Sequence, residues 1–305
     1  MDALAAVVTL LKPQAIGAKI IHGAGRWGVR YPAFNQPSFA LVLKGPCWLA
    51  VDGIPATILE TGDFVLFPAM PGFTLASDSK VKPGAMKPAP TGKQVEEIFH
   101  GDATKEPSVS LLGGYFAFDP VNAALLLEFL PKMLRVRATD PAIGNIAAVV
   151  ELIRREAGEK RAGRSLVLAR LIEIVLVEAL RSAPAEVITT GLLAGLRDPQ
   201  LAAALLGIHT RTAHPWTLAT LAREAAMSRS SFAERFARVV GLTPLNYLLQ
   251  WRLAVAKDLL ARERKSVGET AFAVGYESAS GFSTAFSRET GHSPMAFIEL
   301  HRSAA

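Results

Sequence analysis

The sequence predicts an α+β protein with an N-terminal β-barrel, a helical middle segment and a C-terminal all-α domain that holds two helix-turn-helix units. Three observations predict this fold. Short runs of β-forming residues, separated by turns, fill residues 20–120. Two apolar helical stretches follow between residues 146 and 180. The last 110 residues or so then contain the same helix-turn-helix pattern twice, about 50 residues apart.

The N-terminal part begins with a short apolar segment and continues as strands. Met1-Asp2 carries an acid rather than a base before the apolar residues, so the start predicts a short amphipathic helix and not a signal peptide. Asp52-Gly53 between two apolar runs predicts a β-hairpin. Many short antiparallel strands at this spacing favour a small barrel or a jelly roll. The expected strands are 39–43, 48–51, 56–59, 64–67, 73–76, 95–99 and 109–118.

The middle segment predicts two helices. Ile146, Val149, Val150 and Ile153 recur on one helical face. Residues 166–180 are apolar over more than half of the helical wheel, which predicts burial on more than one side. One side can pack on the β domain, while the other is available either to a second subunit or to the rest of the same chain.

The C-terminal copies match residue by residue. The first copy places Leu218, Ala222, Phe232 and Phe236 at positions that Val267, Ala271, Phe282 and Phe286 take in the second. The offset is 49 residues as far as Ala226 and Gly275, and 50 residues from Ser228 and Ser278 onward. The second turn is therefore one residue longer. Ser228 and Ser278 are expected to cap the second helix of each copy.

A single helix is expected to join the two copies. Thr243-Pro244 begins it, and its apolar positions continue to about Glu263. Twenty residues at about 1.5 Å each span roughly 30 Å. Successive major-groove faces of B-DNA are about 34 Å apart, so one rigid helix can set two recognition helices into adjacent grooves.

These residues resemble the AraC/XylS family of bacterial transcription regulators over about residues 196–305. The tail pattern Gly275-Tyr-Glu-Ser278, Phe282, Phe286 and Gly291-His-Ser-Pro294 carries the resemblance. It implies that the second helix of each copy reads DNA, mostly through short side chains that suit methyl, water-mediated and shape contacts. Glu234 is either a cytosine contact or a solvated charge. The implied base-facing residues are Arg229, Ser230, Ala233, Glu234, Ala279, Ser280, Ser283 and Thr284.

Phosphate contacts are expected from cations around these helices, since backbone contacts position a protein without specifying sequence. Each of them could equally be a surface charge or part of an intramolecular pair. The candidates are Arg223, Arg238, Arg252, Lys257 and Arg288.

The β-rich part resembles the cupin-type sensor domain found at the N-terminus of some regulators of that family. The carrying residues are 25–28, 41–45, 47–49, 62–68 and 74–78. Three domains are therefore expected: a cupin-like regulatory domain over 1–135, a helical linker and dimerisation segment over 136–195, and the DNA-binding domain over 196–305. Homodimerisation through the middle helix is what the resemblance implies.

Many cupins are metal-dependent oxygenases, so an enzyme with an appended DNA-targeting module is the alternative function. Metal sites of that kind need clustered histidines. The chain has six histidines and no His-x-His, and four of the six lie outside the β domain. We therefore expect no catalytic residues, no metal and no cofactor. Apolar residues either line an effector cavity inside the barrel or simply fill it: Phe39, Leu41, Trp48, Phe64, Phe67, Phe73 and Phe116.

Composition agrees with a sequence-specific DNA-binding transcription regulator. The formal net charge is +6, and residues 196–305 carry 13 Lys and Arg against 9 Asp and Glu, which suits phosphate attraction. The single cysteine, Cys47, excludes an intrachain disulfide and fits a reducing cytoplasm; burial in a strand is favoured over a redox role. No segment is long and apolar enough to span a membrane. The expected partners are double-stranded DNA, a second copy of the chain, RNA polymerase, and an effector that the sequence does not identify.

Overall fold

The computed structural model describes residues 2–33, 36–85, 96–118, 132–139, 144–159, 161–182 and 190–302. The chain forms two compact units. One, here the helical unit, comprises Met1–Lys12, Phe118–Leu130 and Ile188–Ala305. The other, here the sheet unit, comprises Pro13–Ala117 and Pro131–Val187.

Two sheets build the sheet unit. One has the strand order β11 (Leu134–Val136), β6 (Phe64–Phe67), β3 (Ser38–Lys44), β10 (Val109–Ala117), β1 (Gln14–Ala24) and β9 (Glu96–Gly101). The other has the order β5 (Ile54–Glu60), β4 (Pro46–Val51), β7 (Phe73–Ala76), β2 (Gly28–Tyr31) and β8 (Gly84–Ala85). Most neighbours are antiparallel, and β9 and β8 join the edges in parallel.

The hairpin expected at Asp52-Gly53 joins β4 to β5, with Gly53 in the left-handed region at φ 75°. Cys47, Leu49 and Val51 alternate inward from β4 and enter the core between the sheets. Burial raises the pKa of the Cys47 thiol to about 12, so its thiolate is suppressed at neutral pH. This environment is that of a core residue rather than of a reactive thiol.

The seven residues expected to share the barrel interior lie on different faces. Phe67 and Phe73 belong to the core between the sheets, together with Val42 and Val65. Because strand neighbours point to opposite faces, Phe39, Leu41, Phe64 and Phe116 point to the other side of the six-stranded sheet. There Phe39 contacts Phe64 and Phe116, at ring-centroid distances of 6.3 and 5.0 Å. Trp48 alternates with Cys47 and is half-buried on the outer face of the five-stranded sheet. The expectation of one interior lined by all seven is corrected accordingly.

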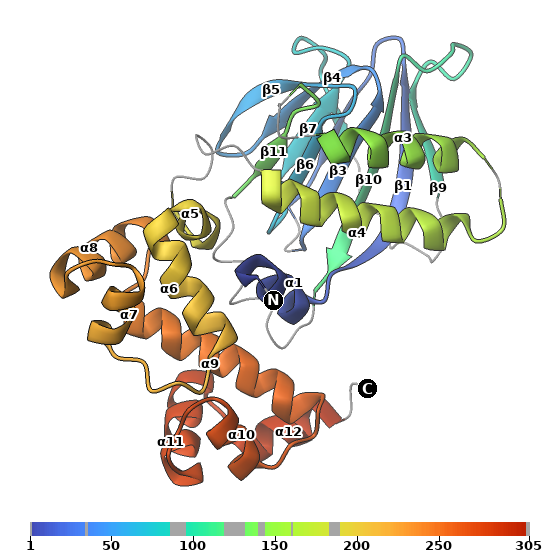
Figure 1. Cartoon of the computed structure of the whole chain (residues 1–305). Coiled ribbons are helices and arrows are strands. Elements are labelled where there is room, and N and C mark those ends of the chain that lie inside the picture. The colour runs from blue at the N-terminus through green and yellow to red at the C-terminus, as the bar shows by residue number, and fades with distance from the viewer. Residues whose placement is uncertain are drawn as a thin grey trace. The chain divides into compact units, whose positions relative to one another are not determined.

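Helices α3 (Gly144–Gly158) and α4 (Arg164–Ser182) run across the six-stranded sheet (Figure 1). Of the four residues expected on one face of α3, Ile146, Val150 and Ile153 are buried and Val149 is half-buried. Glu173 of α4 accepts a hydrogen bond from the backbone N–H of Ala15 on β1, at 3.2 Å. The linker was expected over residues 136–195. Its described helices, α3 and α4, pack within the sheet unit and do not form a separate compact unit.

The helical unit is organised around α9 (Pro244–Ala261). Its first half packs beside α8 (Arg229–Val240), where Phe236 meets Tyr247 edge-on at 5.7 Å. Its second half supplies Leu253, Leu259 and Leu260 to a core with α10 (Val267–Ala273), α11 (Ala279–Thr290) and α12 (Pro294–Arg302). Helices α5 (Leu192–Arg197), α6 (Pro199–Thr210) and α7 (Leu218–Glu224) also belong to this unit. Asp198 caps α6 and Pro199 opens it, as expected.

The N-terminal helix α1 (Ala3–Leu11) belongs to the helical unit. It contacts α6 and α9. The Ala3 carbonyl lies 3.2 Å from Nδ1 of His209, and Lys12 Nζ lies 2.6 Å from Asp258. By their contacts residues 1–12 group with the C-terminal helices, whereas the cupin-like domain expected over 1–135 includes them; that domain boundary stays a prediction.

Candidate DNA-binding interface

The first helix-turn-helix motif, residues 217–243, is formed by α7 and α8. Thr217 and Thr220 make a reciprocal capping box at the start of α7. Ser228 caps α8 by accepting from the Ser231 N–H at 3.2 Å. Phe232 and Phe236 are fully buried and hold α8 on the core, so its opposite face is left to solvent.

The second motif, residues 266–293, repeats this construction with α10 and α11. Ser266 and Glu269 form the capping box, and Ser278 caps α11. Phe282 and Phe286 are buried at the positions that Phe232 and Phe236 take in the first motif. Both second helices end on a left-handed glycine, Gly241 or Gly291.

The turn of the second motif, residues 274–278, is one residue longer than that of the first, residues 225–228, as the change of offset predicts. Ala226 and Gly275 occupy the same place in the two turns, and both have positive φ, 51° and 82°. A left-handed conformation suits glycine and strains alanine, so the first turn carries a local cost.

The eight expected base-facing residues lie on α8 and α11. Arg229, Ser230 and Glu234 of the first motif are exposed, as are Ser280 and Thr284 of the second. The three smaller side chains of the set are half-buried: Ala233, Ala279 and Ser283. On these faces Arg229 and Glu234 of α8 are the long side chains, and the other six are short.

The five expected phosphate contacts divide. Arg223, Arg238 and Arg288 are exposed. Lys257 is half-buried on α9, where burial lowers the pKa of its ammonium group, and its phosphate contact stays a prediction. Arg252 makes hydrogen bonds within the chain, and its phosphate contact stays a prediction. Its Nε donates to the Thr212 carbonyl at 3.2 Å and its Nη2 to the His214 carbonyl at 2.7 Å, so it ties the α6–α7 loop to α9.

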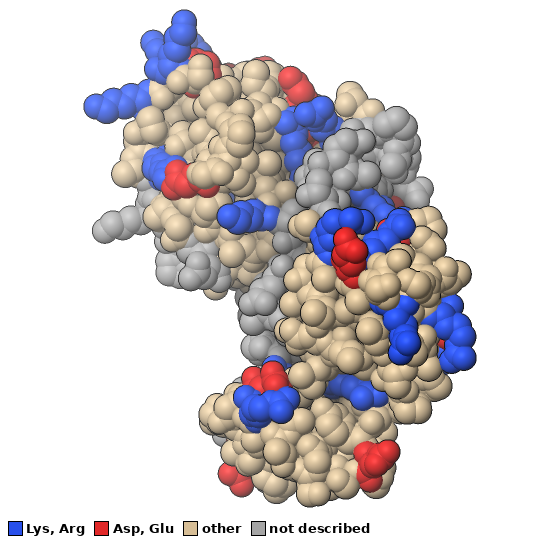
Figure 2. Space-filling model, turned by 90° about the vertical axis from the view of Figure 1, so that its left-hand side faces the viewer, with Lys and Arg blue, Asp and Glu red and all other residues tan. Residues whose placement is uncertain are grey.

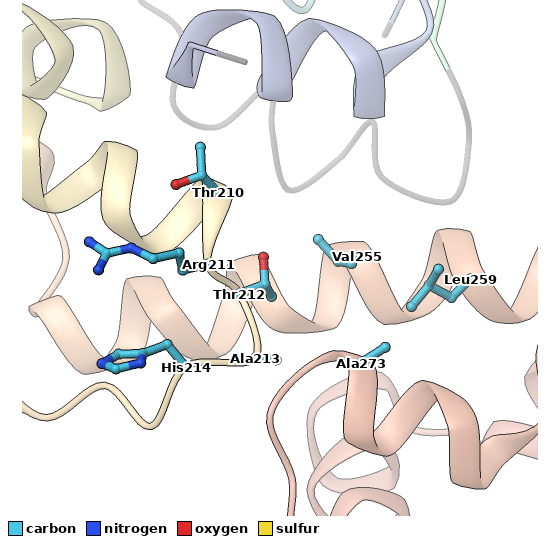
Figure 3. Close-up of a pocket in the computed structure, with 8 residues that line it drawn as sticks. All are labelled: Thr210, Arg211, Thr212, Ala213, His214, Val255, Leu259 and Ala273. Carbon is cyan, nitrogen blue, oxygen red and sulfur yellow. The ribbon is translucent and has the colours of Figure 1, made fainter.

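That loop borders an open hollow of about 570 Å³ beside α9 (Figure 3). Thr210 to His214 line it on one side, Val255 and Leu259 of α9 form its floor, and Ala273 of α10 closes the other side. Helices α7 and α8 of the first motif and α10 of the second all contact α9.

A positioning contact was not foreseen from the sequence. Arg235 on α8 donates through Nε to Asp198 at 2.7 Å and through Nη1 to Gln200 at 3.0 Å. These bonds fix α8 against the start of α6. The capping role of Asp198 was readable locally, but its second role depends on which helix packs beside it.

Within the part of the chain that the structure describes, no three His, Cys, Asp or Glu side chains are grouped so that they could hold a metal ion. The described helices also include none with the length and apolarity needed to cross a membrane.

Comparison with known proteins covers both halves of the chain. A family model described as Cupin matches residues 2–185, and one described as Helix-turn-helix domain matches residues 221–299. A putative AraC-like transcription regulator of Streptomyces lividans is 37% identical, over 96% of this chain and 97% of its own length. The HTH-type transcriptional regulator AlkR of Acinetobacter baylyi is 26% identical, over 96% and 98%. Among solved structures, the DNA-binding domain of AdpA, in complex with a target DNA, is similar at 31% identity and a TM-score of 0.33, over 35% of this chain and 96% of that one.

Proposed function

Because the chain belongs to the AraC-like transcription regulators, with a cupin domain followed by a helix-turn-helix domain, we propose that α8 and α11 enter two successive major grooves of double-stranded DNA. The observation that carries this proposal is the sharing of α9 by both motif cores. An 18-residue helix extends about 27 Å, close to the distance of roughly 34 Å between successive groove faces.

Base reading is assigned to the exposed faces of the two recognition helices. Glu234 and Thr284 occupy equivalent positions, one on each helix. A glutamate accepts from the cytosine amino group, whereas a threonine methyl suits the thymine methyl. The two motifs therefore read different bases at corresponding points of their half-sites.

Selection of duplexes from a randomised library by the full chain tests this proposal. We expect a motif of two contact blocks about one helical turn, 10 to 10.5 base pairs, apart. Glu234→Gln should change the preferred bases of one block only, and Thr284→Ala those of the other, so each variant controls for its counterpart. Enrichment of no motif, with binding that falls steeply with salt, would contradict sequence-specific reading.

We propose further that the protein regulates without catalysing a reaction. Its relatives are transcription regulators, and this supports a non-enzymatic role. A DNA-bound regulator acts in the cytoplasm beside the chromosome, where RNA polymerase is a candidate partner. Stoichiometric iron, manganese or zinc in purified protein would favour the alternative of a cupin enzyme with a DNA-targeting module.

A homodimer through α4 is part of the proposal. Leu166, Val167 and Ile174 are exposed on this helix, and Leu152 is exposed on neighbouring α3. Such a patch on a paired helix surface suits a second copy of the same surface.

Ile174→Arg tests the dimer by light scattering. Ile174 is 46% exposed, so the charge does not disturb the core, and we expect a fall from dimer to monomer mass. Leu171 is half-buried, so an arginine there would also disturb packing within the chain. Ile58→Arg is the matched control, since Ile58 is 51% exposed on β5 and should leave the mass unchanged. A dimer that survives Ile174→Arg would remove α4 from the interface.

Control by a small effector in the sheet unit also stays a proposal. Of the expected lining residues, Phe67 and Phe73 face the core between the sheets. An apolar effector that enters this core would contact these two side chains. A thermal-shift screen with the full chain tests for it.

A further inference from the structure

The two helix-turn-helix motifs share a fold but differ in charge. Residues 217–243 hold four arginines and two glutamates, which gives a net charge of +2. Residues 266–293 hold one arginine and three glutamates, a net charge of −2. The capping and burial pattern is the same in both, so the difference is confined to the surface.

Three of the four arginines of the first motif have no cationic counterpart in the second. Phe272 replaces Arg223 at the offset of 49. Ala279 and Ala285 replace Arg229 and Arg235 at the offset of 50. Arg235 is engaged with Asp198, but the guanidinium groups of Arg223 and Arg229 are exposed and form no ion pair with any described residue.

The fourth pair keeps its arginine and changes its surroundings. Arg238 is exposed on α8, and no carboxylate among the described residues pairs with it. Arg288 has the adjacent Glu289 as an ion-pair partner at 2.8 Å, where the first motif has Val239. Even the retained cation of the second motif is thus partly neutralised.

The face in Figure 2 agrees with this comparison. At its foot, where Figure 1 places α10 to α12, most atoms belong to uncharged residues; acidic groups lie at the left and right edges, and one basic cluster lies at the upper left beside an acidic group. Lysine and arginine side chains are more frequent over the part of the helical unit above it.

We propose that the first motif supplies the phosphate contacts that hold the protein on DNA, and that the second motif reads bases with little attraction to the backbone. This inference rests on the proposed DNA-binding function. A cation that meets a phosphate releases condensed counterions, whereas Phe272, 61% exposed, and Ala279 release none. The second motif therefore binds only where its base contacts are favourable, after the first has docked.

The segment before the second motif does not restore the balance. Arg262 pairs with Asp258 at 3.7 Å and Lys265 with Glu263 at 3.2 Å. Arg264 is exposed there and can serve one phosphate at most.

Arg238→Ala and Arg288→Ala, at equivalent positions in the full chain, form the matched test. The probe is a duplex recovered by selection, and the readout is the slope of log affinity against log salt concentration. Arg238→Ala should reduce the slope by about 0.9, the value for one phosphate contact. Arg288→Ala should reduce it by less than half of that. Equal losses would overturn the assignment.

A gain-of-charge variant tests the same inference independently. Phe272→Arg gives the second motif the cation that Arg223 supplies in the first, at a position that is 61% exposed and outside the base-facing set. The slope should become steeper by about 0.9; an unchanged slope would show that missing cations do not separate the two motifs and would overturn the inference. If the wild-type protein selects no sequence, the proposed function is contradicted. If the wild-type protein selects a motif but the two alanine variants lose equal amounts of slope, only this inference is contradicted.

Discussion

His209 is a buried histidine held in its neutral form. It stacks on Trp251 at a centroid distance of 3.8 Å, and its Nε2 lies 2.7 Å from the Tyr247 hydroxyl. Nδ1 donates to the Ala3 carbonyl, so Nε2 accepts from the hydroxyl. Burial lowers the pKa of His209 to about 4. A charged imidazole would lose solvation here and gain no carboxylate partner in return.

The stability of the helical unit should therefore fall in mild acid. The imidazole binds a proton below about pH 6.5 in the unfolded chain, but only near pH 4 in the folded chain. The contribution of His209 to stability is therefore complete above about pH 7 and declines as the pH falls from about 6.5 to 4. We expect a loss of about 2 kcal/mol between pH 7 and pH 5. Urea unfolding at both pH values measures it.

His209→Gln should remove this part of the pH dependence, whatever it does to stability at pH 7. His292→Gln, at an exposed site, is the control and should keep it. Equal pH dependence in His209→Gln and wild type would show that His209 is not the group responsible.

At the scale of elements, the two turns allow backbone strain to be compared at equivalent positions, Ala226 and Gly275. A Cβ on Gly275 would lie 2.6 Å from Arg252 Nη2 and 2.7 Å from the Ala213 carbonyl oxygen. Its φ of 82° is also unfavourable for an L side chain. Ala226 pays the conformational cost at the same place in the first motif.

Gly275→Ala should lower the free energy of unfolding by about 1–3 kcal/mol, because strain and a steric clash add. Ala226→Gly should raise it by up to about 1 kcal/mol by relieving the left-handed alanine. Chemical denaturation of the two variants beside wild type gives both values. Opposite signs at equivalent positions are the expected result, and destabilisation by both changes would argue against strain in the first turn.

At the scale of the whole molecule, the first twelve residues complete the DNA-binding half of the chain. Ala3, Val7 and Leu10 of α1 are buried, although α1 precedes the first strand of the sheet unit. The C-terminal helices thus pack against a segment that is distant in sequence, since Ala3 and His209 are 206 positions apart.

Val7→Asp should destabilise the helical unit by about 2–3 kcal/mol, since it buries a carboxylate without a partner. Thr9→Asp, on the exposed side of the same helix, should change stability by less than about 0.5 kcal/mol. Tryptophan fluorescence during denaturation follows the change through Trp251. An equal effect of both substitutions would mean that α1 does not dock in solution.

Local sequence determined the two motifs almost completely. Caps at Ser228 and Ser278, buried Phe232 and Phe282, and the longer second turn all follow from spacing within one or two helical turns. The strands 64–67 and 73–76 were likewise predicted at their observed bounds. These features are readable because each depends on neighbours close in the chain.

Tertiary structure decided what depends on distant partners. The faces of Phe39 and Phe67 followed only from the sheet register, since a shift of one residue exchanges the two sides of a strand. The place of α1, the engagement of Arg252 by the α6–α7 loop and the bond from Arg235 to Asp198 depend on which helices pack side by side. Sequence thus specified the helices, the strands and the repeated helix-turn-helix motif, because helix periodicity and capping are short-range. Packing decided whether each charged or aromatic side chain lies in a core, ties two helices together or is exposed on the surface.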